Sequence, residues 1–177
     1  TVGAVLADAR RRGVERLGAQ LLLAREPGCP RTWRLAHDDT PLDDAAAARV
    51  DAALVRRAAG EPLAYLLGEK EFHGLVLQVD TRVLVPRPDT EVLVDWAIER
   101  LRASKAAAPR VVDLGTGSGA IALAVAHAHP AVQLIATDLS EDALAVARGN
   151  AARLGLGLQF AAGAWWQAVG EQRFDLA

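Results

Sequence analysis

The sequence predicts an α/β protein with three parts: a small N-terminal helical bundle, a β-hairpin linker and the first part of a parallel sheet flanked by helices. Three patterns predict this class. Apolar residues recur at helical spacing through residues 1–70, and they alternate with a period of two after Phe72. From Arg110, apolar runs and helical stretches follow one another in βαβ order. We therefore expect a linker over residues 71–88 and a third domain over residues 89–177, whose sheet is incomplete at its C-terminal end.

The composition is typical of a globular protein without a charge bias. The chain has 177 residues, of which 51% are apolar, and its formal net charge is −2. This balance provides no overall basic field for nucleic acid. No apolar run approaches the roughly 18 residues that cross a bilayer, and no signal-peptide pattern opens the chain. The single cysteine, Cys29, allows no internal disulfide and suits a reducing compartment. We expect a cytoplasmic monomer that binds no membrane and no nucleic acid directly.

The first domain is predicted to consist of short helices. An early amphipathic stretch, stopped by Pro27-Gly28, has four apolar residues near helical spacing: Leu17, Leu21, Leu22 and Ala24. The clearest helix is predicted to begin with Thr40 as its N-cap and with Asp43 completing a capping box. Its apolar face is Leu42, Ala46, Val50, Ala53 and Leu54. Gly60 ends this helix, and a short helix follows from Gly60-Glu61-Pro62 to Leu67.

The linker is predicted as a hairpin with two arms. Leu75, Leu77 and Val79 alternate with exposed positions, which is typical of a half-buried strand. The turn is expected at residues 80–82, and residues 83–85 are expected to form the returning strand. Pro86-Arg87-Pro88 then ends the hairpin. The next helix is expected from about Asp89 to Ala103, with its apolar face on Leu93, Trp96, Ala97 and Leu101.

The third domain alternates strands and helices. After a loop, a strand from Arg110 leads into a glycine-rich turn and a helix, and the second strand is expected over residues 134–137. Ser140 is predicted to cap the next helix, and Gly155 to end it. A third strand over residues 158–161 follows, and residues 174–176 resemble the start of a fourth. This order predicts parallel strands with right-handed crossovers.

The glycine-rich turn, VVDLGTGSGAI over residues 111–121, indicates a ligand site. A strand that passes through glycines into a helix lets a ligand touch the backbone and directs helix N–H groups toward it. Asp138 lies 23 residues after Gly115, at the end of the next predicted strand, where a carboxylate can accept hydrogen bonds from both ribose hydroxyls. The pair indicates a nucleoside-containing cofactor. The alternatives are a turn that only packs and an Asp138 that only caps the following helix.

The glycine spacing alone leaves the cofactor open. Gly115, Gly117 and Ala120 can be fitted to the dinucleotide pattern G-x-G-x-x-G/A. Asp113 followed by G-x-G-x-G, however, resembles motif I of the class I S-adenosylmethionine-dependent methyltransferases. The methionine amino group of that cofactor is cationic, and an acid beside the turn suits this charge better than it suits phosphates.

Several further motifs extend the resemblance over nearly the whole chain. They are Gly60-Glu61-Pro62-Leu63-Ala64-Tyr65-Leu66-x-Gly68, Glu71-Phe72, Pro86-Arg87-Pro88-Asp89-Thr90-Glu91, Thr137-Asp138-Leu139-Ser140 and Ala147-Arg148-x-Asn150-Ala151. With the glycine turn, they resemble the bacterial peptide chain release factor glutamine methyltransferases, the PrmC/HemK family. PRPDTE is the most discriminating of them. It separates this branch from the related ribosomal-protein glutamine methyltransferase.

The resemblance implies a fold, a reaction and a partner. The fold is a helical N-terminal domain that docks release factors, a β-hairpin linker and a Rossmann-like class I methyltransferase domain. The reaction moves a methyl group from S-adenosylmethionine to the amide nitrogen (N5) of the glutamine in the GGQ loop of peptide chain release factors, which modulates translation termination. The family orients this amide with an Asn-Pro-Pro-Tyr motif after the fourth strand. That motif would lie beyond Ala177, so we expect no catalytic residue in this chain and no activity of the chain alone.

The resemblance also implies which residues bind the cofactor: Asp113, Gly115, Thr116, Gly117, Ser118, Gly119, Asp138, Leu139 and Trp165. Arg87 and Thr90 are two further candidates near its methionine end, with a proline-stiffened turn as the alternative interpretation. Trp165 is a candidate cover for the adenine, although paired aromatics also pack as core or rim residues. This sequence departs from the family at Ala164, where members often have an acid, because Ala164 cannot accept a hydrogen bond from the adenine amino group. We expect no metal site, since His37, His73, His127 and His129 show no ligand spacing.

Other functions share parts of this pattern. An amino-group methyltransferase acting on nucleic acid would have the same glycine turn, but it predicts a basic face that the balanced charge of residues 1–70 does not supply. An amino-group methyltransferase of another protein is the second alternative. A nicotinamide-dependent oxidoreductase predicts tighter binding of NAD than of S-adenosylmethionine. A docking role for the helical domain is compatible with the release factor reaction.

Overall fold

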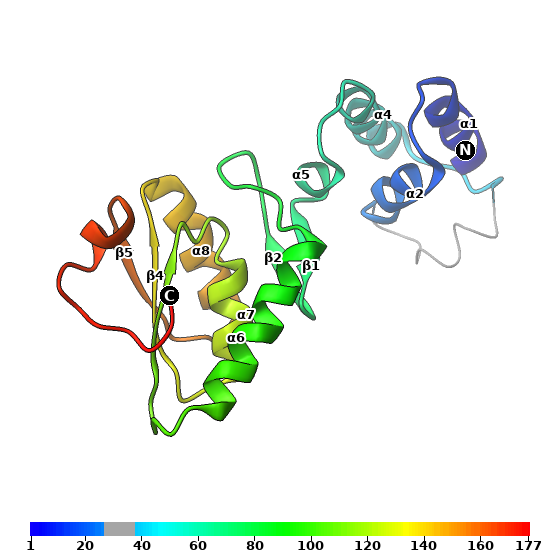
Figure 1. Ribbon diagram of the computed structural model, residues 1–177. Coiled ribbons are helices and arrows are strands. Elements are labelled where there is room, and N and C mark those ends of the chain that lie inside the picture. The colour runs from blue at the N-terminus through cyan, green and yellow to red at the C-terminus, as the bar shows by residue number, and fades with distance from the viewer. Residues whose placement is uncertain (27–37) are drawn as a thin grey trace. The chain divides into compact units, whose positions relative to one another are not determined.

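The computed structural model describes residues 1–26 and 38–177 (Figure 1). Cys29, His37 and the stop expected at Pro27-Gly28 lie outside these residues. The chain divides into two compact units, Thr1–Leu67 and Gly68–Ala177. Within the described residues, no helix is long and apolar enough to cross a membrane.

The first unit is helical, as the sequence predicts. Its described helices are α1 (Val2–Arg11), α2 (Arg16–Ala24), α4 (Asp44–Ala58) and α5 (Leu63–Leu67). They bury a core that includes Val2, Leu23, Val50 and Leu54. The predicted faces hold in part: Ala46, Val50 and Leu54 of α4 are buried, but Leu17 of α2 is 55% exposed. The buried face of α2 is instead Ala19, Leu22 and Leu23, so the face is rotated about the helix axis and shares only Leu22 with the prediction.

The helix cap of α4 differs from the prediction. Asp43, and not Thr40, is the N-cap, and its carboxylate accepts a hydrogen bond from the Ala46 backbone N–H at 2.7 Å. The Thr40 backbone carbonyl instead accepts the Val2 N–H at 3.0 Å. The prediction was wrong by three residues because Thr40, Pro41 and Asp43 all suit a helix start, and local spacing does not choose among them.

The hairpin lies earlier in the chain than predicted. Strand β1 (Glu69–Phe72) pairs antiparallel with β2 (Leu75–Gln78). The turn is His73-Gly74, and both residues have positive φ, 50° and 79°, as a two-residue turn with right-handed twist requires. The predicted strand is confirmed up to Gln78; Leu75, Leu77 and Val79 are all buried, but Val79 lies just after the strand. Its predicted partner over residues 83–85 is wrong, since those residues form no strand.

Helix α6 (Glu91–Ala103) follows a short 3₁₀ turn, η1 (Pro88–Thr90). Its buried residues are Val94, Ala97, Ile98 and Leu101. The predicted face was rotated by about one residue, because Leu93 and Trp96 are 49% and 46% exposed. These two side chains line a cavity described below.

The second unit contains the predicted parallel sheet. Strands β3 (Arg110–Leu114), β4 (Gln133–Asp138) and β5 (Gln159–Ala162) lie in this order and pair in parallel. Helix α7 (Ala120–Ala128) joins β3 to β4, and α8 (Glu141–Leu154) joins β4 to β5. Leu176 forms a single parallel bridge with Val111 on the other side of β3, where the start of a fourth strand was predicted.

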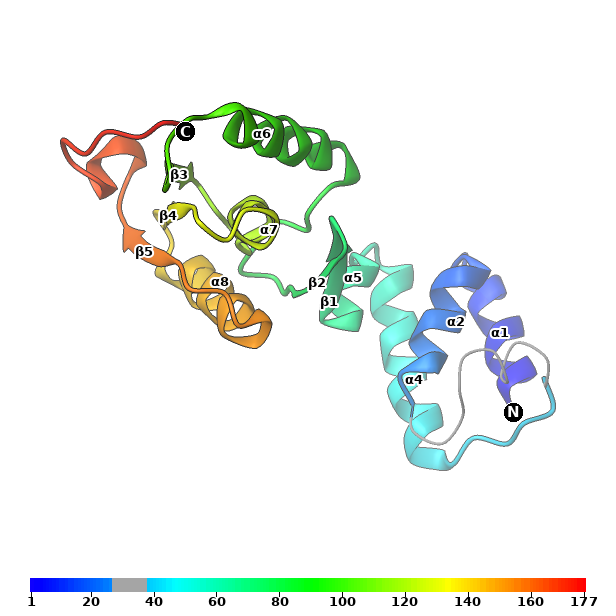
Figure 2. The ribbon, with the colours of Figure 1, turned by 90° about the horizontal axis from the view of Figure 1, so that it is seen from below.

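The sheet has a different covering on each face. Figure 2 shows α6, α7 and α8 together on one face, and the core there includes Val111, Leu123, Leu134 and Ala136. Side chains alternate across a strand, so Val112 and Ile135 belong to a separate cluster with Val169 on the other face. Asp113 has the same parity as Val111, which places it on the helix-covered face at the carboxyl end of β3.

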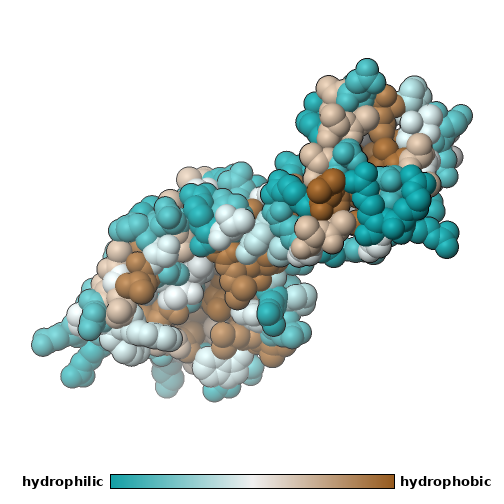
Figure 3. Space-filling view, turned by 90° about the horizontal axis from the view of Figure 1, so that it is seen from above, coloured by the Kyte–Doolittle hydropathy of each residue, from teal (hydrophilic) through white to brown (hydrophobic). Residues whose placement is uncertain are grey.

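The carboxyl edge of the sheet carries the candidate site. Strands β3 and β4 end at Leu114 and Asp138, and α7 begins at Ala120. Figure 3, viewed from the side toward which these strands run in Figure 1, shows hydrophobic patches among hydrophilic surface on this unit. In open α/β sheets this edge is where ligands bind.

Candidate functional site

The glycine turn between β3 and α7 has a backbone that only glycine adopts readily. Gly115, Gly117 and Gly119 have φ values of 81°, 56° and 83°, which are unfavourable for residues with a Cβ. At Gly119 there is a second constraint, because a Cβ would lie 2.9 Å from Cδ1 of Leu123. The three glycines are therefore explained by the backbone path, and they leave the turn without side chains at those positions.

The turn is fixed to the end of β4. The Thr137 carbonyl accepts two backbone hydrogen bonds, from the Gly115 N–H at 2.9 Å and from the Thr116 N–H at 2.8 Å. The Gly119 N–H donates to the Thr116 carbonyl at 2.9 Å. Ser118 and Thr116 are buried. The turn is thus ordered by its own hydrogen bonds, so its remaining N–H groups have a defined direction.

Asp113, at the end of β3, is hydrogen-bonded to the glycine turn. The Thr116 hydroxyl donates to Oδ2 of Asp113 at 2.7 Å. Burial raises the pKa of the Asp113 carboxyl above its ordinary value; the Thr116 hydrogen bond opposes this rise, and the charge of Asp138 adds to it. A buried carboxylate is stabilised in its charged form by a cationic ligand group beside it. The methionine amino group of the cofactor expected from the sequence is such a cation.

Asp138 connects β4 to the turn. Its Oδ2 accepts the Gly117 N–H at 2.9 Å, and its Oδ1 accepts the Ser140 N–H at 2.9 Å. The N-cap of α8 is Ser140, whose hydroxyl accepts the Ala143 N–H at 3.2 Å. The alternative in which Asp138 is simply the cap of α8 is therefore not what the structure shows. Each carboxylate oxygen keeps a further lone pair for a ligand hydroxyl.

A cavity of about 320 Å³ opens beside Asp113. Its walls come from β3, α6 and α7, together with residues near the C-terminal end. They include Asp113, Leu93, Trp96, Ile121, Trp165 and Leu176. The structure thus brings Trp165 and Asp113 to one cavity, although they lie far apart in the sequence.

Two candidate site residues that follow β4 and β5 are exposed. Leu139 and Trp165 are 76% and 73% exposed, and Trp165 has a φ of 48°, which is uncommon for a bulky residue. The Gly163 N–H donates to the Asp138 carbonyl at 3.0 Å, so the two strand ends are held together. Ala164 follows directly and offers no side-chain acceptor.

Arg87 and Thr90 lie in the segment before α6. The Thr90 N–H donates to the Arg87 carbonyl at 3.0 Å, which closes the 3₁₀ turn η1. Among the described residues, neither of them forms a hydrogen bond with the glycine turn. The structure therefore does not join these two candidates to the other site residues.

Asn150 is a site residue whose role the sequence pattern did not reveal. It is fully buried in α8, and its Nδ2 donates to the Ser118 carbonyl at 2.9 Å. The available signal was its place in the Ala147-Arg148-x-Asn150-Ala151 match. A polar residue on the buried stripe of a helix needs partners, but those partners are distant in sequence.

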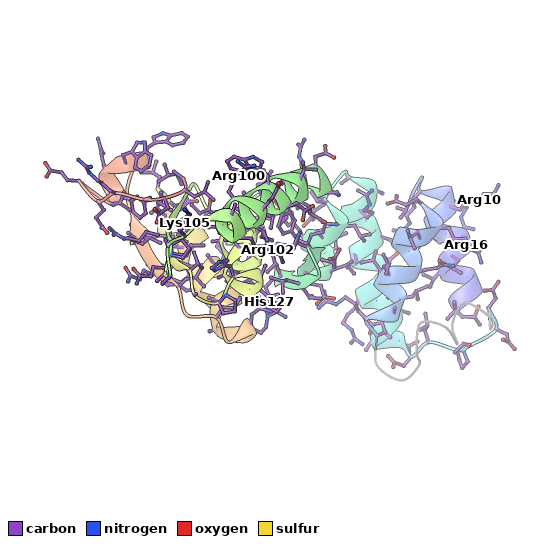
Figure 4. The ribbon with its side chains drawn as sticks, turned by 60° about the horizontal axis from the view of Figure 1, so that its bottom comes forward. Arg10, Arg16, Arg100, Arg102, Lys105 and His127 are labelled. Carbon is purple, nitrogen blue, oxygen red and sulfur yellow. The ribbon has the colours of Figure 1, made fainter. Side chains whose placement is uncertain are left out.

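Four exposed basic residues of the second unit lie away from the glycine turn. Figure 4 labels Arg100, Arg102 and Lys105 at the end of α6 and His127 at the end of α7. Both helices end where the chain returns to the amino ends of β3 and β4, which is the opposite edge of the sheet. In the part of the chain that the structure describes, no group of three His, Cys, Asp or Glu residues is placed to hold a metal ion.

Comparisons with known proteins agree with this geometry. Residues 3–68 match the PrmC N-terminal domain family, and residues 90–177 match the methyltransferase small domain family. The release factor glutamine methyltransferase of Bordetella pertussis is 50% identical over 165 residues, which cover 93% of this chain and 60% of that protein. The one from Xylella fastidiosa strain Temecula1 is 45% identical over 174 residues, which cover 98% of this chain and 62% of that protein.

The likeness to solved structures is weaker. The tRNA (uracil-54, C5)-methyltransferase of Pyrococcus abyssi, in complex with S-adenosyl-L-homocysteine, has a TM-score of 0.49 at 14% identity, covering 61% of this chain and 26% of that one. This adds nothing to the matches by sequence.

A parallel sheet has its glycine turn between two acids, and residues 90–177 match the methyltransferase small domain family; together these identify the second unit as a class I methyltransferase domain. Matches to both domain families, and 41–50% identity to the relatives over about nine tenths of the chain, narrow the class further. The chain belongs to the PrmC/HemK family. It spans about three fifths of the length of the curated relatives it matches.

Proposed function

We propose that this chain binds S-adenosylmethionine at the glycine turn. We further propose that the whole protein methylates N5 of the glutamine in the GGQ motif of peptide chain release factors. The observation that carries the proposal is the placement of Asp113 and Asp138 on either side of an ordered glycine turn, 2.7 and 2.9 Å from its Thr116 hydroxyl and Gly117 N–H. The relatives named for this activity support the substrate.

Each site residue has a proposed task. Asp138 accepts hydrogen bonds from the ribose hydroxyls, and Asp113 faces the cationic amino group. Gly115, Gly117 and Gly119 let the ligand approach the backbone, while Thr116 and Ser118 hold the turn. Leu139 and Trp165 contact the adenine, and Arg87 and Thr90 are assigned to the methionine end. When bound, S-adenosylmethionine supplies an electrophilic methyl group on its sulfonium.

The chain's contribution to the reaction is to bind and orient. An amide nitrogen is a poor nucleophile because its lone pair is delocalised, so it must be held in line with the methyl group. We assign that task to no residue of this chain. Residues 1–70 are proposed to dock the release factor, with residues 71–88 as the linker to the methyltransferase domain of residues 89–177. We propose that the protein acts as a monomer.

The first test is calorimetric titration of the chain, and of a version extended past Ala177, with S-adenosylhomocysteine and separately with NAD. We expect binding of S-adenosylhomocysteine alone. Asp138→Ala should weaken that binding roughly 10- to 100-fold, the size of a lost hydrogen bond to a charged group. The matched control is Asp142→Ala, an exposed acid in the first turn of α8, which should leave affinity unchanged. Binding of NAD alone would overturn the proposal.

The substrate is tested separately with the extended protein. We expect one methyl group on the glutamine of a GGQ-containing release factor, located by mass spectrometry after digestion. A GGQ→GGA release factor is the control, since it lacks the amide. Methylation of nucleic acid or of a different protein, with no methylation of the release factor, would overturn the proposed substrate. The proposed cofactor site would still stand.

A further inference from the structure

Asn150 connects the hairpin to the glycine turn. The Asn150 side chain is fully buried and uses both ends of its amide. Its Oδ1 accepts the Gln78 N–H at 2.7 Å, and its Nδ2 donates to the Gln78 carbonyl at 3.0 Å. The same Nδ2 donates to the Ser118 carbonyl at 2.9 Å. One side chain of α8 therefore holds strand β2 and the turn together.

The Asn150 side chain pairs with the backbone of Gln78 as a neighbouring strand would. The Val79 N–H donates to the Gly68 carbonyl at 3.1 Å. Antiparallel ladders alternate, so the N–H and carbonyl of Gln78 point away from β1. The Asn150 amide meets both groups as the backbone of a neighbouring strand would. Both bonds are to backbone atoms, so they depend on the position of β2 and not on the identity of residue 78.

The contact with Ser118 fixes one peptide plane in the turn. The Ser118 carbonyl and the Gly119 N–H belong to the same planar peptide group. The carbonyl is held by Asn150, and the N–H donates to Thr116 at 2.9 Å. Gly119 is the N-cap of α7. The plane that sets the direction of the first N–H groups of α7 is therefore held at both ends.

We propose that Asn150 is a positioning residue for the cofactor: by holding the Ser118–Gly119 peptide against β2, it presets the glycine turn that receives S-adenosylmethionine. This inference rests on the proposed function of the turn. Asn150 is not proposed to touch the ligand. It acts through the backbone of the turn, and the hairpin gives that backbone a rigid support.

A matched control is available on the same helix. Arg153 lies one turn further along α8, and its guanidinium donates to the Val76 carbonyl and to Oδ1 of Asn150. Arg153 thus ties α8 to β2, but among the described residues it forms no hydrogen bond with the turn. Loss of Arg153 removes bonds to β2 and to Asn150 but none to the turn, whereas loss of Asn150 loosens the hairpin and frees the Ser118 carbonyl.

The experiment compares Asn150→Ala and Arg153→Ala by calorimetric titration with S-adenosylhomocysteine, at a temperature well below the thermal unfolding of both variants. A binding site must be held within about 0.5 Å of its productive geometry by the groups that support it. We therefore expect affinity to fall at least about tenfold in Asn150→Ala and to change less than about twofold in Arg153→Ala. Equal affinity losses, or wild-type affinity in folded Asn150→Ala, would overturn the inference.

A second measurement needs no variant. In the wild-type chain, the Asn150 side-chain NH₂ and the Gln78 amide should shift in NMR spectra as S-adenosylhomocysteine is added, although neither touches the ligand. Their resonances should stay unchanged if Asn150 only fills the core. Failure of the wild-type chain to bind S-adenosylhomocysteine would instead contradict the proposed function, so the two failures are distinguishable.

Discussion

At the scale of single residues, the two acids beside the glycine turn have different surroundings. Both oxygens of Asp138 accept backbone N–H groups, from Gly117 and Ser140. Asp113 has its hydroxyl partner, Thr116, but burial raises the pKa of its carboxyl. The Asp138 carboxylate is therefore oriented before a ligand arrives. The Asp113 carboxylate is the one whose charged form a neighbouring cation stabilises most.

From its proposed role, we predict that Asp113 makes the cofactor affinity depend on pH. A cationic amino group favours the charged carboxylate, so affinity for S-adenosylhomocysteine should rise as the pH rises through the raised pKa of Asp113. Asp113→Asn should weaken binding at neutral pH and abolish this rise. Titration calorimetry across the acidic range measures it, with Asp142→Asn as the control. An unchanged pH profile in Asp113→Asn would contradict the assignment.

The same residue predicts the pH dependence of stability. The folded pKa is raised, so between the ordinary carboxyl pKa and the folded pKa the native state holds more protons than the unfolded state. The free energy of unfolding contributed by Asp113 therefore falls as the pH rises through that interval. Asp113→Asn removes this fall and should raise stability at neutral pH, as measured by urea unfolding at several pH values.

At the scale of elements, the turn and the helices tolerate glycine replacement differently. Gly119→Ala places a Cβ 2.9 Å from Leu123 at a φ of 83°, and it should reduce the free energy of unfolding by about 1–3 kcal/mol. Gly149 lies inside α8 with no atom near its added Cβ, so Gly149→Ala should stabilise by about 0.5–1 kcal/mol. Urea unfolding measures both. Equal effects of the two changes would mean that the turn is not constrained.

Element types were predictable from the sequence, but several boundaries and faces were not. The spacing of apolar residues along the sequence identified the helices and the parallel strands, because burial of an element determines where its apolar residues recur. The hairpin was misplaced because a His-Gly turn lacks the Asn-Gly or Asp-Gly signal, while residues 80–82 have ordinary turn chemistry. In the candidate site, local spacing singled out the glycines and Asp138, and the resemblance to methyltransferase motif I singled out Asp113. Asn150 was not assigned a role, because its partners Gln78 and Ser118 are 72 and 32 residues away.

At the scale of the whole molecule, each of the two units has its own core. The core of the first unit includes Leu54, and that of the second includes Leu123; both side chains are at most 1% exposed. No described core cluster draws buried residues from both units. We therefore expect the units to lose structure separately.

Paired truncations test this expectation. Leu54→Ala and Leu123→Ala should each cost about 2–5 kcal/mol, the usual range for a buried leucine. Hydrogen exchange should accelerate in residues 1–67 for the first variant and in residues 68–177 for the second. Leu54→Ala should leave affinity for S-adenosylhomocysteine unchanged. If it accelerated exchange equally in both units, they would be unfolding as one.

The hydrogen bonds that Asn150 and Arg153 of α8 form with β2 also affect solubility. A two-stranded hairpin leaves an outer row of N–H and carbonyl groups, and such a row is a template on which a second chain can add a strand. Here Asn150 saturates both groups of Gln78, and Arg153 occupies the Val76 carbonyl. Both outward backbone groups of Gln78 and the Val76 carbonyl are thus already paired within the chain, which limits the pairing of another chain with this edge of β2. Opening that edge would favour aggregation even where folding itself survived.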